Sequence, residues 1–220
     1  MQLAAQAPEA IERPLLRGAI HGVAFAASLG VGVLLIVFSR ESRVLPATVF
    51  ACSAALMLGT STLYHRITWS PSARMWMRRA DHAAIFLLIA GTYTPVALVS
   101  LRGTWGITVL VLVWSGAIAA TISKFCWIGA PKWWSALLGL GLGWVGVIVL
   151  PRFAHREGLA PLILLAAGGL AYTAGALVYA LKKPDLYPRV FGYHELFHAL
   201  TIVALACQYV AIAFFVVRVA

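Results

Sequence analysis

Seven apolar stretches, each close to twenty residues long, alternate with short polar connections along the chain. They cover residues 18–38, 45–64, 80–101, 104–122, 133–150, 159–181 and 190–217. About 20 apolar residues in an α-helix cross the hydrocarbon core of a bilayer. Ser70 and Pro71, ahead of the third stretch, form a typical helix start, so we expect that helix to be well under way at Asp81. The pattern predicts an all-α, polytopic membrane protein with a seven-transmembrane-helix bundle.

Composition leaves no room for a soluble domain. The 220 residues are 62% hydrophobic and 11% charged, and the mean hydropathy is +0.90, so polar side chains are too few to cover a globular fold in water. We expect residues 1–16 to form a short cytoplasmic segment and residues 17–220 a single transmembrane domain. The N-terminus lacks the pattern of a removable signal peptide.

The basic residues predict the orientation. There are 17 Lys and Arg against 7 Asp and Glu, and they lie in the short connections, where anionic headgroups are a simpler partner than nucleic acid. On the N-terminal side are Arg13, Arg17, Arg66, Arg74, Arg78, Arg79, Lys124, Lys132, Lys182, Lys183 and Arg189; on the other are Arg40, Arg43, Arg102, Arg152, Arg156 and Arg218. Because Lys and Arg are retained in the cytoplasm, we expect the N-terminus inside and the C-terminus outside.

The cysteines show no disulfide or metal-binding spacing. Cys52, Cys126 and Cys207 are isolated within apolar stretches, and we expect them to be small core residues.

Three histidines and an aspartate are predicted to meet at one level of the membrane. His194 and His198 are four residues apart and share one face of the seventh helix, His65 ends the second helix, and Asp81 lies near the start of the third. The alternation of the helices brings all four to the cytoplasmic side. Ionisable groups at membrane depth are costly, so such a layer needs a purpose.

Three neutral imidazoles with one open position are the ligands of a catalytic zinc site, where the metal lowers the pKa of a bound water to about 7. Asp81 could then orient or deprotonate that water, or it could instead pair with Arg78, Arg79 or Lys132. Ser61, one turn before His65, could hydrogen-bond a ligand, the water or a substrate oxyanion. It could equally bond only its own backbone four residues back.

Other polar residues near this layer are explained more simply by roles outside the ligand set. His194 to His198 also form an HExxH string, but Glu195 points about a quarter turn away from the histidines, so Asp81 is preferred to it as the general base. We expect His82 to be a packing residue and His21 an interfacial one, with contact to the ligand group as the alternative for His21. His155 falls on the opposite side.

Three segments, STLYHR, RADHAAIFLLIAGTYTP and HELFHAL, resemble the signature segments of the hemolysin III family, which belongs with the progestin and adiponectin receptors. The resemblance covers the chain from about Arg17 onward. These families share a Ser-x-x-x-His, Asp and His-x-x-x-His pattern with alkaline ceramidases, in a superfamily of membrane metal-dependent hydrolases. The pattern falls here on Ser61, His65, Asp81, His194 and His198. It implies Zn²⁺ held by the three histidines, a water near Asp81, and a place in a bacterial inner (plasma) membrane.

Three functions follow as hypotheses. The first is a zinc-dependent hydrolase of a lipid amide or ester, with Asp81 and Ser61 as the catalytic residues. The second is a lipid-sensing, receptor-like protein in which the zinc is structural. The third, suggested only by the family name, is a pore-forming cytolysin, although the chain shows no amphipathic pore lining. In each case the expected partners are membrane lipids, including a lipid amide or fatty-acid ligand, and no nucleic acid.

Overall fold

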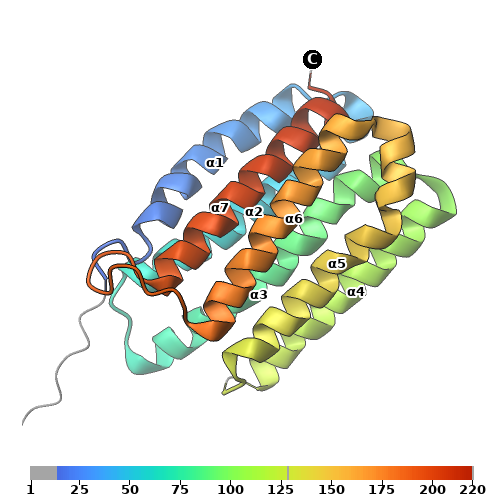
Figure 1. The fold of residues 1–220 in the computed structure, drawn as a ribbon. Helices are drawn as coiled ribbons and strands as arrows, with labels where there is room; N and C mark the ends of the chain where they lie inside the picture. Colours follow the sequence, from blue (N-terminus) through green and yellow to red (C-terminus); the bar gives the residue numbers. More distant parts are fainter. Residues whose placement is uncertain (1–13, 128, 220) are drawn as a thin grey trace, which may run out of the picture.

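The structure, a computed structural model, describes residues 14–127 and 129–219, and seven long helices dominate it (Figure 1). They are α1 (Ala19–Val37), α2 (Val44–Arg66), α3 (Pro71–Pro95), α4 (Gly103–Cys126), α5 (Lys132–Glu157), α6 (Leu159–Leu181) and α7 (Tyr193–Val210). A 3₁₀ turn, η1 (Glu41–Arg43), precedes α2, and π-helical segments extend α3 and α7 as η2 (Val96–Leu101) and η3 (Ala211–Val217). All seven helices are long and apolar enough to cross a membrane, which confirms the predicted fold class.

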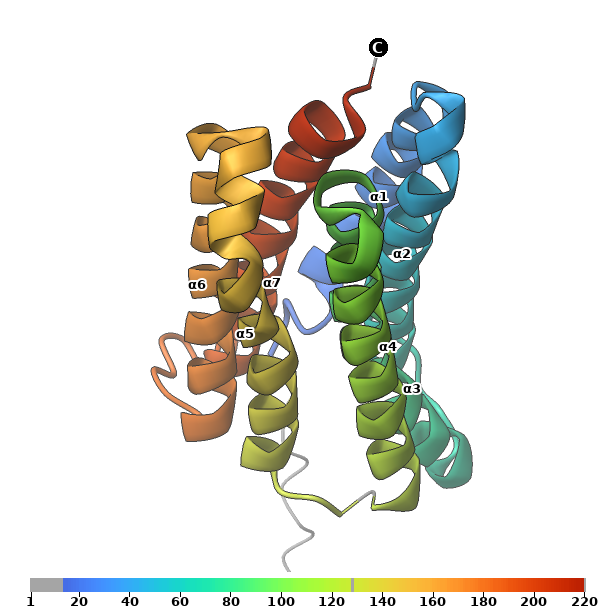
Figure 2. The same cartoon turned by 90° about the vertical axis from the view of Figure 1, so that its right-hand side faces the viewer.

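The helices form a closed bundle. Each of α1 to α4 packs against the next, α5 packs chiefly against α6, and α7 lies between α6 and α1. Figures 1 and 2 show α7 between α6 and α1 and the short connection that joins α4 to α5. The odd-numbered helices therefore begin at the end of the bundle where the even-numbered ones finish, as expected from the short connections.

The start of α3 follows the signal seen in the sequence. The Ser70 hydroxyl accepts a hydrogen bond from the Ala73 backbone N–H at 3.4 Å, and Pro71 occupies the first turn, where a missing N–H costs nothing. Asp81 consequently lies in the third turn of α3 and is buried. This is the depth that the metal-site hypothesis needs.

Two helix boundaries differ from the apolar pattern. α5 continues through Pro151 to Glu157, so the connection to α6 is the single residue Gly158, whose φ of 87° suits glycine. Proline inside a membrane helix is tolerated where neighbouring groups satisfy the freed carbonyl. α7 begins at Tyr193 rather than at residue 190, because Gly192 and Glu195 form its N-terminal cap.

Two apolar clusters make the core. One contains Phe50 and Met57 of α2 with Leu205 of α7, and the other contains Phe86 of α3 with Phe153 of α5. Many other large apolar side chains lie on the outer surface, as expected where lipid covers the protein.

The expectation for the cysteines was wrong in part. Cys52 and Cys126 are exposed, and Cys207 is half-buried. Hydropathy identifies a spanning helix but not which of its faces meets lipid, so small residues of such helices need not lie in the core.

Candidate metal centre and its cavity

The structure brings the three predicted histidine ligands together. His65 comes from the last turn of α2, and His194 and His198 from the first turns of α7. One ring nitrogen of each lies within 4.8 Å of the others, and the Nε2 atoms of His65 and His194 are 3.2 Å apart. His198 is buried, and the other two are half-buried.

The spacing of one pair of these nitrogens matches that around a tetrahedral metal ion. Zn–N bonds of about 2.0–2.1 Å at tetrahedral angles place neighbouring ligand nitrogens about 3.3 Å apart, close to the 3.2 Å between His65 and His194. Three imidazoles form a neutral donor set of the kind that binds divalent metals and leaves one position open. The described residues could therefore hold a metal ion at the site predicted from the sequence.

Ser61 and Asp81 lie next to the histidines. Both are buried, the Ser61 hydroxyl is 2.9 Å from Nδ1 of His21, and the Asp81 carboxylate lies beside that hydroxyl. The alternative of an Asp81 ion pair is not seen, because the ion pairs within residues 14–127 and 129–219 join Arg17 to Glu195 and Arg218 to Glu157.

His21 belongs to the site rather than to the interface. Its ring stacks on that of His198, with centroids 3.9 Å apart and planes 9° from parallel, and its side chain is 2% exposed. The interfacial expectation was therefore wrong. His21 lies near the start of the first helix, at the level of the other histidines, and this was the one signal in the sequence that it belongs with them.

The chain preceding α1 closes over the cluster. Gly18 takes a left-handed backbone with φ of 75°, and a Cβ placed on it would be 2.6 Å from Cβ of His65. Backbone N–H groups of Leu15 and Leu16 donate to the carbonyls of Arg189 and Val190. Only glycine lets the backbone pass so close to a ligand residue.

Glu195 has a structural task, although it lies in the HExxH string. One carboxylate oxygen accepts the Gly192 backbone N–H at 2.9 Å, and the other pairs with Arg17. Because both oxygens are engaged, Glu195 caps α7 and ties it to the chain before α1. Asp81 remains the carboxylate that faces the site.

The remaining histidines behave as expected. Nε2 of His82 is 3.3 Å from the Tyr179 hydroxyl, so His82 packs α3 against α6. His155 is exposed near the C-terminal end of α5, at the opposite end of the bundle.

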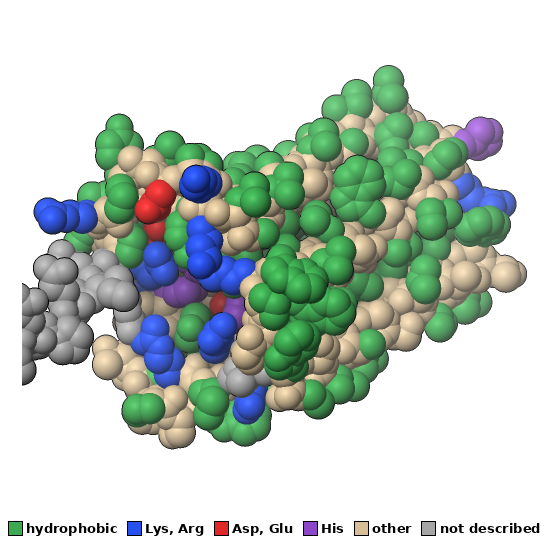
Figure 3. All heavy atoms as spheres, turned by 60° about the horizontal axis from the view of Figure 1, so that its bottom comes forward, with side chains coloured by type: hydrophobic (Ala, Val, Ile, Leu, Met, Phe, Trp, Pro, Cys, Tyr) green, Lys and Arg blue, Asp and Glu red, His purple; other side chains and the backbone are tan. Residues whose placement is uncertain are grey.

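A cavity of about 450 Å³ extends from the site between α3, α5, α6 and α7. His198, Ser61 and Asp81 line one end, and most of the remaining wall is apolar, with residues such as Leu88 and Phe153. Its volume is typical of a small-molecule site. Figure 3 shows this end of the molecule, where Lys and Arg side chains surround a hollow with histidine and acidic side chains in its depth. The sequence did not predict the extent of the cavity, since much of its wall comes from α5 and α6, which carry no motif.

Comparison with known proteins identifies the family of this chain. The family described as "Haemolysin-III related" matches residues 9–209. The chain belongs to this family. The haemolysin-III chain is 32% identical to the "Hemolysin-3 homolog" of Bacillus subtilis (strain 168) over 214 residues, which cover 95% of this chain and 97% of the relative. It is 29% identical to "Hemolysin-3" of Bacillus cereus over 215 residues, covering 96% and 94%.

The haemolysin-III chain is also similar to a more distant heptahelical protein. The "Heptahelical transmembrane protein ADIPOR2" of Oryza sativa subsp. japonica is 27% identical over 191 residues, which cover 76% of this chain and 80% of the relative. The family resemblance drawn from the sequence is thus confirmed. Seven spanning helices and bacterial relatives of similar length agree with an integral protein of the plasma membrane.

Proposed function

We propose that this haemolysin-III protein is a zinc-dependent hydrolase of a lipid amide or ester. The observation that carries the proposal is the position of a three-histidine group and a buried carboxylate at one end of a largely apolar cavity of about 450 Å³. With the N-terminus in the cytoplasm, as the distribution of Lys and Arg favours, the site belongs to the cytoplasmic leaflet.

A bound zinc ion would polarise the substrate carbonyl and lower the pKa of a bound water to about 7. Asp81 is the carboxylate placed to accept a proton from the attacking water, because the described ion pairs leave it uncommitted. It can return that proton to the leaving nitrogen or oxygen. His198, His194 and His65 serve as neutral ligands.

Ser61 and His21 hold Asp81 in place. In the tautomer of His21 that carries its proton on Nδ1, that N–H donates to the Ser61 oxygen at 2.9 Å, and the Ser61 hydroxyl can then donate to the adjacent Asp81 carboxylate. In this arrangement Ser61 is a positioning residue and not a donor to the substrate oxyanion.

The cavity selects the substrate class. Its apolar wall, with Leu88, Ile89 and Phe153, suits an acyl chain. Such a wall is poorly suited to a hydrated ion, so it favours a lipid hydrolase over a conducting pore.

A second candidate is a receptor-like protein in which the metal is structural. It is favoured by the sequence separation of the ligands, since a metal held by His65 and His194 would fasten residues 129 positions apart on α2 and α7. In that case Asp81 would be dispensable and the histidines would be essential for folding.

The deciding experiment compares Asp81→Asn, His198→Ala and the exposed control His155→Ala. Each full-length protein is placed in lipid nanodiscs, its metal content is measured by mass spectrometry, and hydrolysis is followed on fluorescent ceramides and fatty-acid esters. We expect about one zinc per wild-type chain, and turnover at least about 100-fold slower in Asp81→Asn with the zinc retained. His198→Ala should lose the metal, and His155→Ala should behave as wild type.

Each result that contradicts the proposal leads to a different conclusion. Unchanged turnover in Asp81→Asn would refute the assigned role of the carboxylate. Zinc-loaded protein that hydrolyses none of the substrates, combined with loss of folded His198→Ala, would favour the structural metal. A wild type purified without chelator that holds no metal would overturn both candidates.

A further inference from the structure

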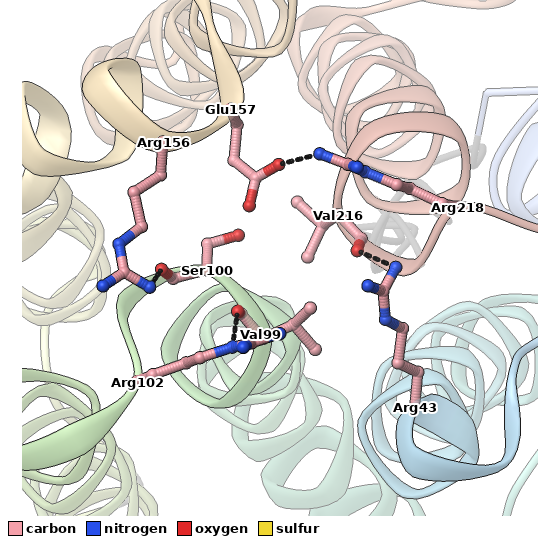
Figure 4. A pocket seen from close by; sticks show the side chains of 8 residues that line it. All are labelled: Arg43, Val99, Ser100, Arg102, Arg156, Glu157, Val216 and Arg218. Atoms are coloured by element: carbon pink, nitrogen blue, oxygen red, sulfur yellow. Dashed lines mark hydrogen bonds and ion pairs between the residues drawn. The ribbon is translucent and has the colours of Figure 1, made fainter.

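Four arginines meet at the end of the bundle opposite the histidines. They line a pocket of about 220 Å³ that contains a single acidic side chain, Glu157. Figure 4 shows the guanidinium groups around this space, which receives side chains from η1, α5 and both π-helical segments. The arginines are Arg43, Arg102, Arg156 and Arg218. The lining therefore carries an excess of three positive charges, which we call the arginine pocket.

The arginines donate to backbone carbonyls, but these bonds do not use all of their N–H groups. Arg43 donates to the Val216 and Val217 carbonyls at 3.1 and 2.8 Å. Arg156 donates to the Ser100 carbonyl at 3.2 Å. A guanidinium has five N–H groups, so each of these two side chains is fixed in position and still has several donors for a ligand.

Ser100 gives an independent sign of a ligand. Its side chain is buried, with 1% exposure, and its hydroxyl has no hydrogen-bond partner among the residues that the structure describes. Serine and threonine in membrane helices usually donate to a carbonyl one turn back, as Thr92 and Thr94 do here. In Figure 4 the Ser100 side chain instead projects into the space between the arginines. A buried hydroxyl without a partner is costly, so an acceptor belongs in this pocket.

We propose that the arginine pocket binds a phosphate-type oxyanion, supplied either by a phospholipid headgroup or by free phosphate. The planar guanidinium fork matches the oxygens of a phosphoryl group, and the Ser100 hydroxyl completes the donor set. Glu157 already pairs with Arg218 at 3.2 Å, and it opposes the ligand by offsetting one of the four positive charges. The site is separate from the metal centre and does not depend on hydrolase activity.

The test measures phosphate and lipid binding to the full-length protein. Inorganic phosphate is titrated into protein in a neutral detergent, with thermal denaturation as the readout. In parallel, nanodiscs of phosphatidylcholine with or without phosphatidylglycerol are used to measure retained lipid by native mass spectrometry. Saturable binding of phosphate identifies a soluble source, and selective retention of phosphatidylglycerol identifies a lipid source. Either result supports the proposal.

Four variants assign the binding to the pocket. Arg156→Gln and Ser100→Ala should each weaken binding, by about tenfold for the arginine, which loses a charge-assisted bond. Arg40→Gln is the matched control, since it removes one exposed charge at the same end from a residue outside the lining, and it should bind as wild type. Glu157→Gln should tighten binding, an outcome that misfolding does not produce.

The proposal is overturned if neither phosphate nor phosphatidylglycerol binds the wild type. It is equally overturned if Arg40→Gln weakens binding as much as Arg156→Gln, because the effect would then be one of surface charge alone.

Discussion

A methyl group added at Gly18 tests whether the chain before α1 holds His65, a proposed metal ligand, in place. Gly18 has φ of 75° and ψ of −8°, and the Cβ of an alanine would be 2.6 Å from Cβ of His65 and 3.3 Å from Cγ of Arg66. The close neighbour is the first carbon of a ligand side chain, which cannot move without moving the imidazole.

The Gly18→Ala substitution has two energetic costs, one from the backbone conformation and one from the steric clash with His65. A left-handed backbone costs a non-glycine residue about 1–2 kcal/mol, and real Cβ contacts essentially never fall below 3.0 Å. The Cβ of His65 must therefore shift by several tenths of an ångström. A metal site tolerates errors of about 0.2 Å in its ligand distances. We expect zinc affinity to fall about 10–100-fold, as for other changes that displace a ligand through its support.

The assay is zinc competition with a fluorescent chelator on detergent-purified protein, together with thermal denaturation. Gly30→Ala is the matched control, because Gly30 lies in α1, the helix that Gly18 precedes, and a Cβ there would have nothing within 4 Å. It should be neutral or slightly stabilising, by up to about 1 kcal/mol. If Gly18→Ala bound zinc as tightly as Gly30→Ala, the packing of Gly18 against His65 would have no part in shaping the site.

Three further changes test the surroundings. Arg17→Met leaves the Glu195 carboxylate buried without its cation and should lower the free energy of unfolding by about 2–3 kcal/mol, measured by denaturation. The loss is smaller than for a fully buried pair because Arg17 is 24% exposed. Adding Glu195→Gln should restore part of the lost stability, and no restoration would refute the pairing. Gly91→Ala would drive a methyl group into the Ser53 side chain of α2 and should lower the yield of monodisperse protein in size-exclusion chromatography, whereas a normal yield would show that α2 and α3 can separate. A chelator should lower the melting temperature of the wild type but not that of His198→Ala, and an equal response in both would place the metal elsewhere.

Much of the fold was predictable from two features of the sequence, the length of its apolar stretches and the shortness of the connections between them. Seven apolar stretches of spanning length joined by short connections force neighbouring helices to run in opposite directions. This alternation alone put His65, Asp81 and the His194/His198 pair at one end of the bundle, and the structure brings the three histidines within coordinating distance.

The sequence could not supply the rotation of each helix about its axis. Hydropathy is high on every face of a spanning helix, so it did not show that His21 faces His198 or that Cys52 faces outward. Local patterns also gave no sign that Glu195 reaches Arg17, which precedes it by 178 positions. Such contacts depend on which helices become neighbours, and that is settled by packing over the whole bundle.

The two polar ends of the bundle are joined by the same two helices. α3 carries Asp81 near its start and leads through η2 to Ser100, while α7 carries His194 and His198 at its start and leads into η3. Both π-helical segments lie at the arginine pocket, where Arg156 donates to the Ser100 carbonyl of η2 and Arg43 donates to the Val216 and Val217 carbonyls of η3. These bonds satisfy backbone carbonyls at membrane depth. An anion in that pocket would stabilise the far ends of α3 and α7, the helices that carry Asp81 and the His194/His198 pair. It would change metal affinity only if the protein had a second arrangement in which the two sites differed, because a ligand shifts an equilibrium only through a difference in its affinity for the two states. A single rigid arrangement therefore predicts that phosphate raises the melting temperature and leaves zinc affinity unchanged.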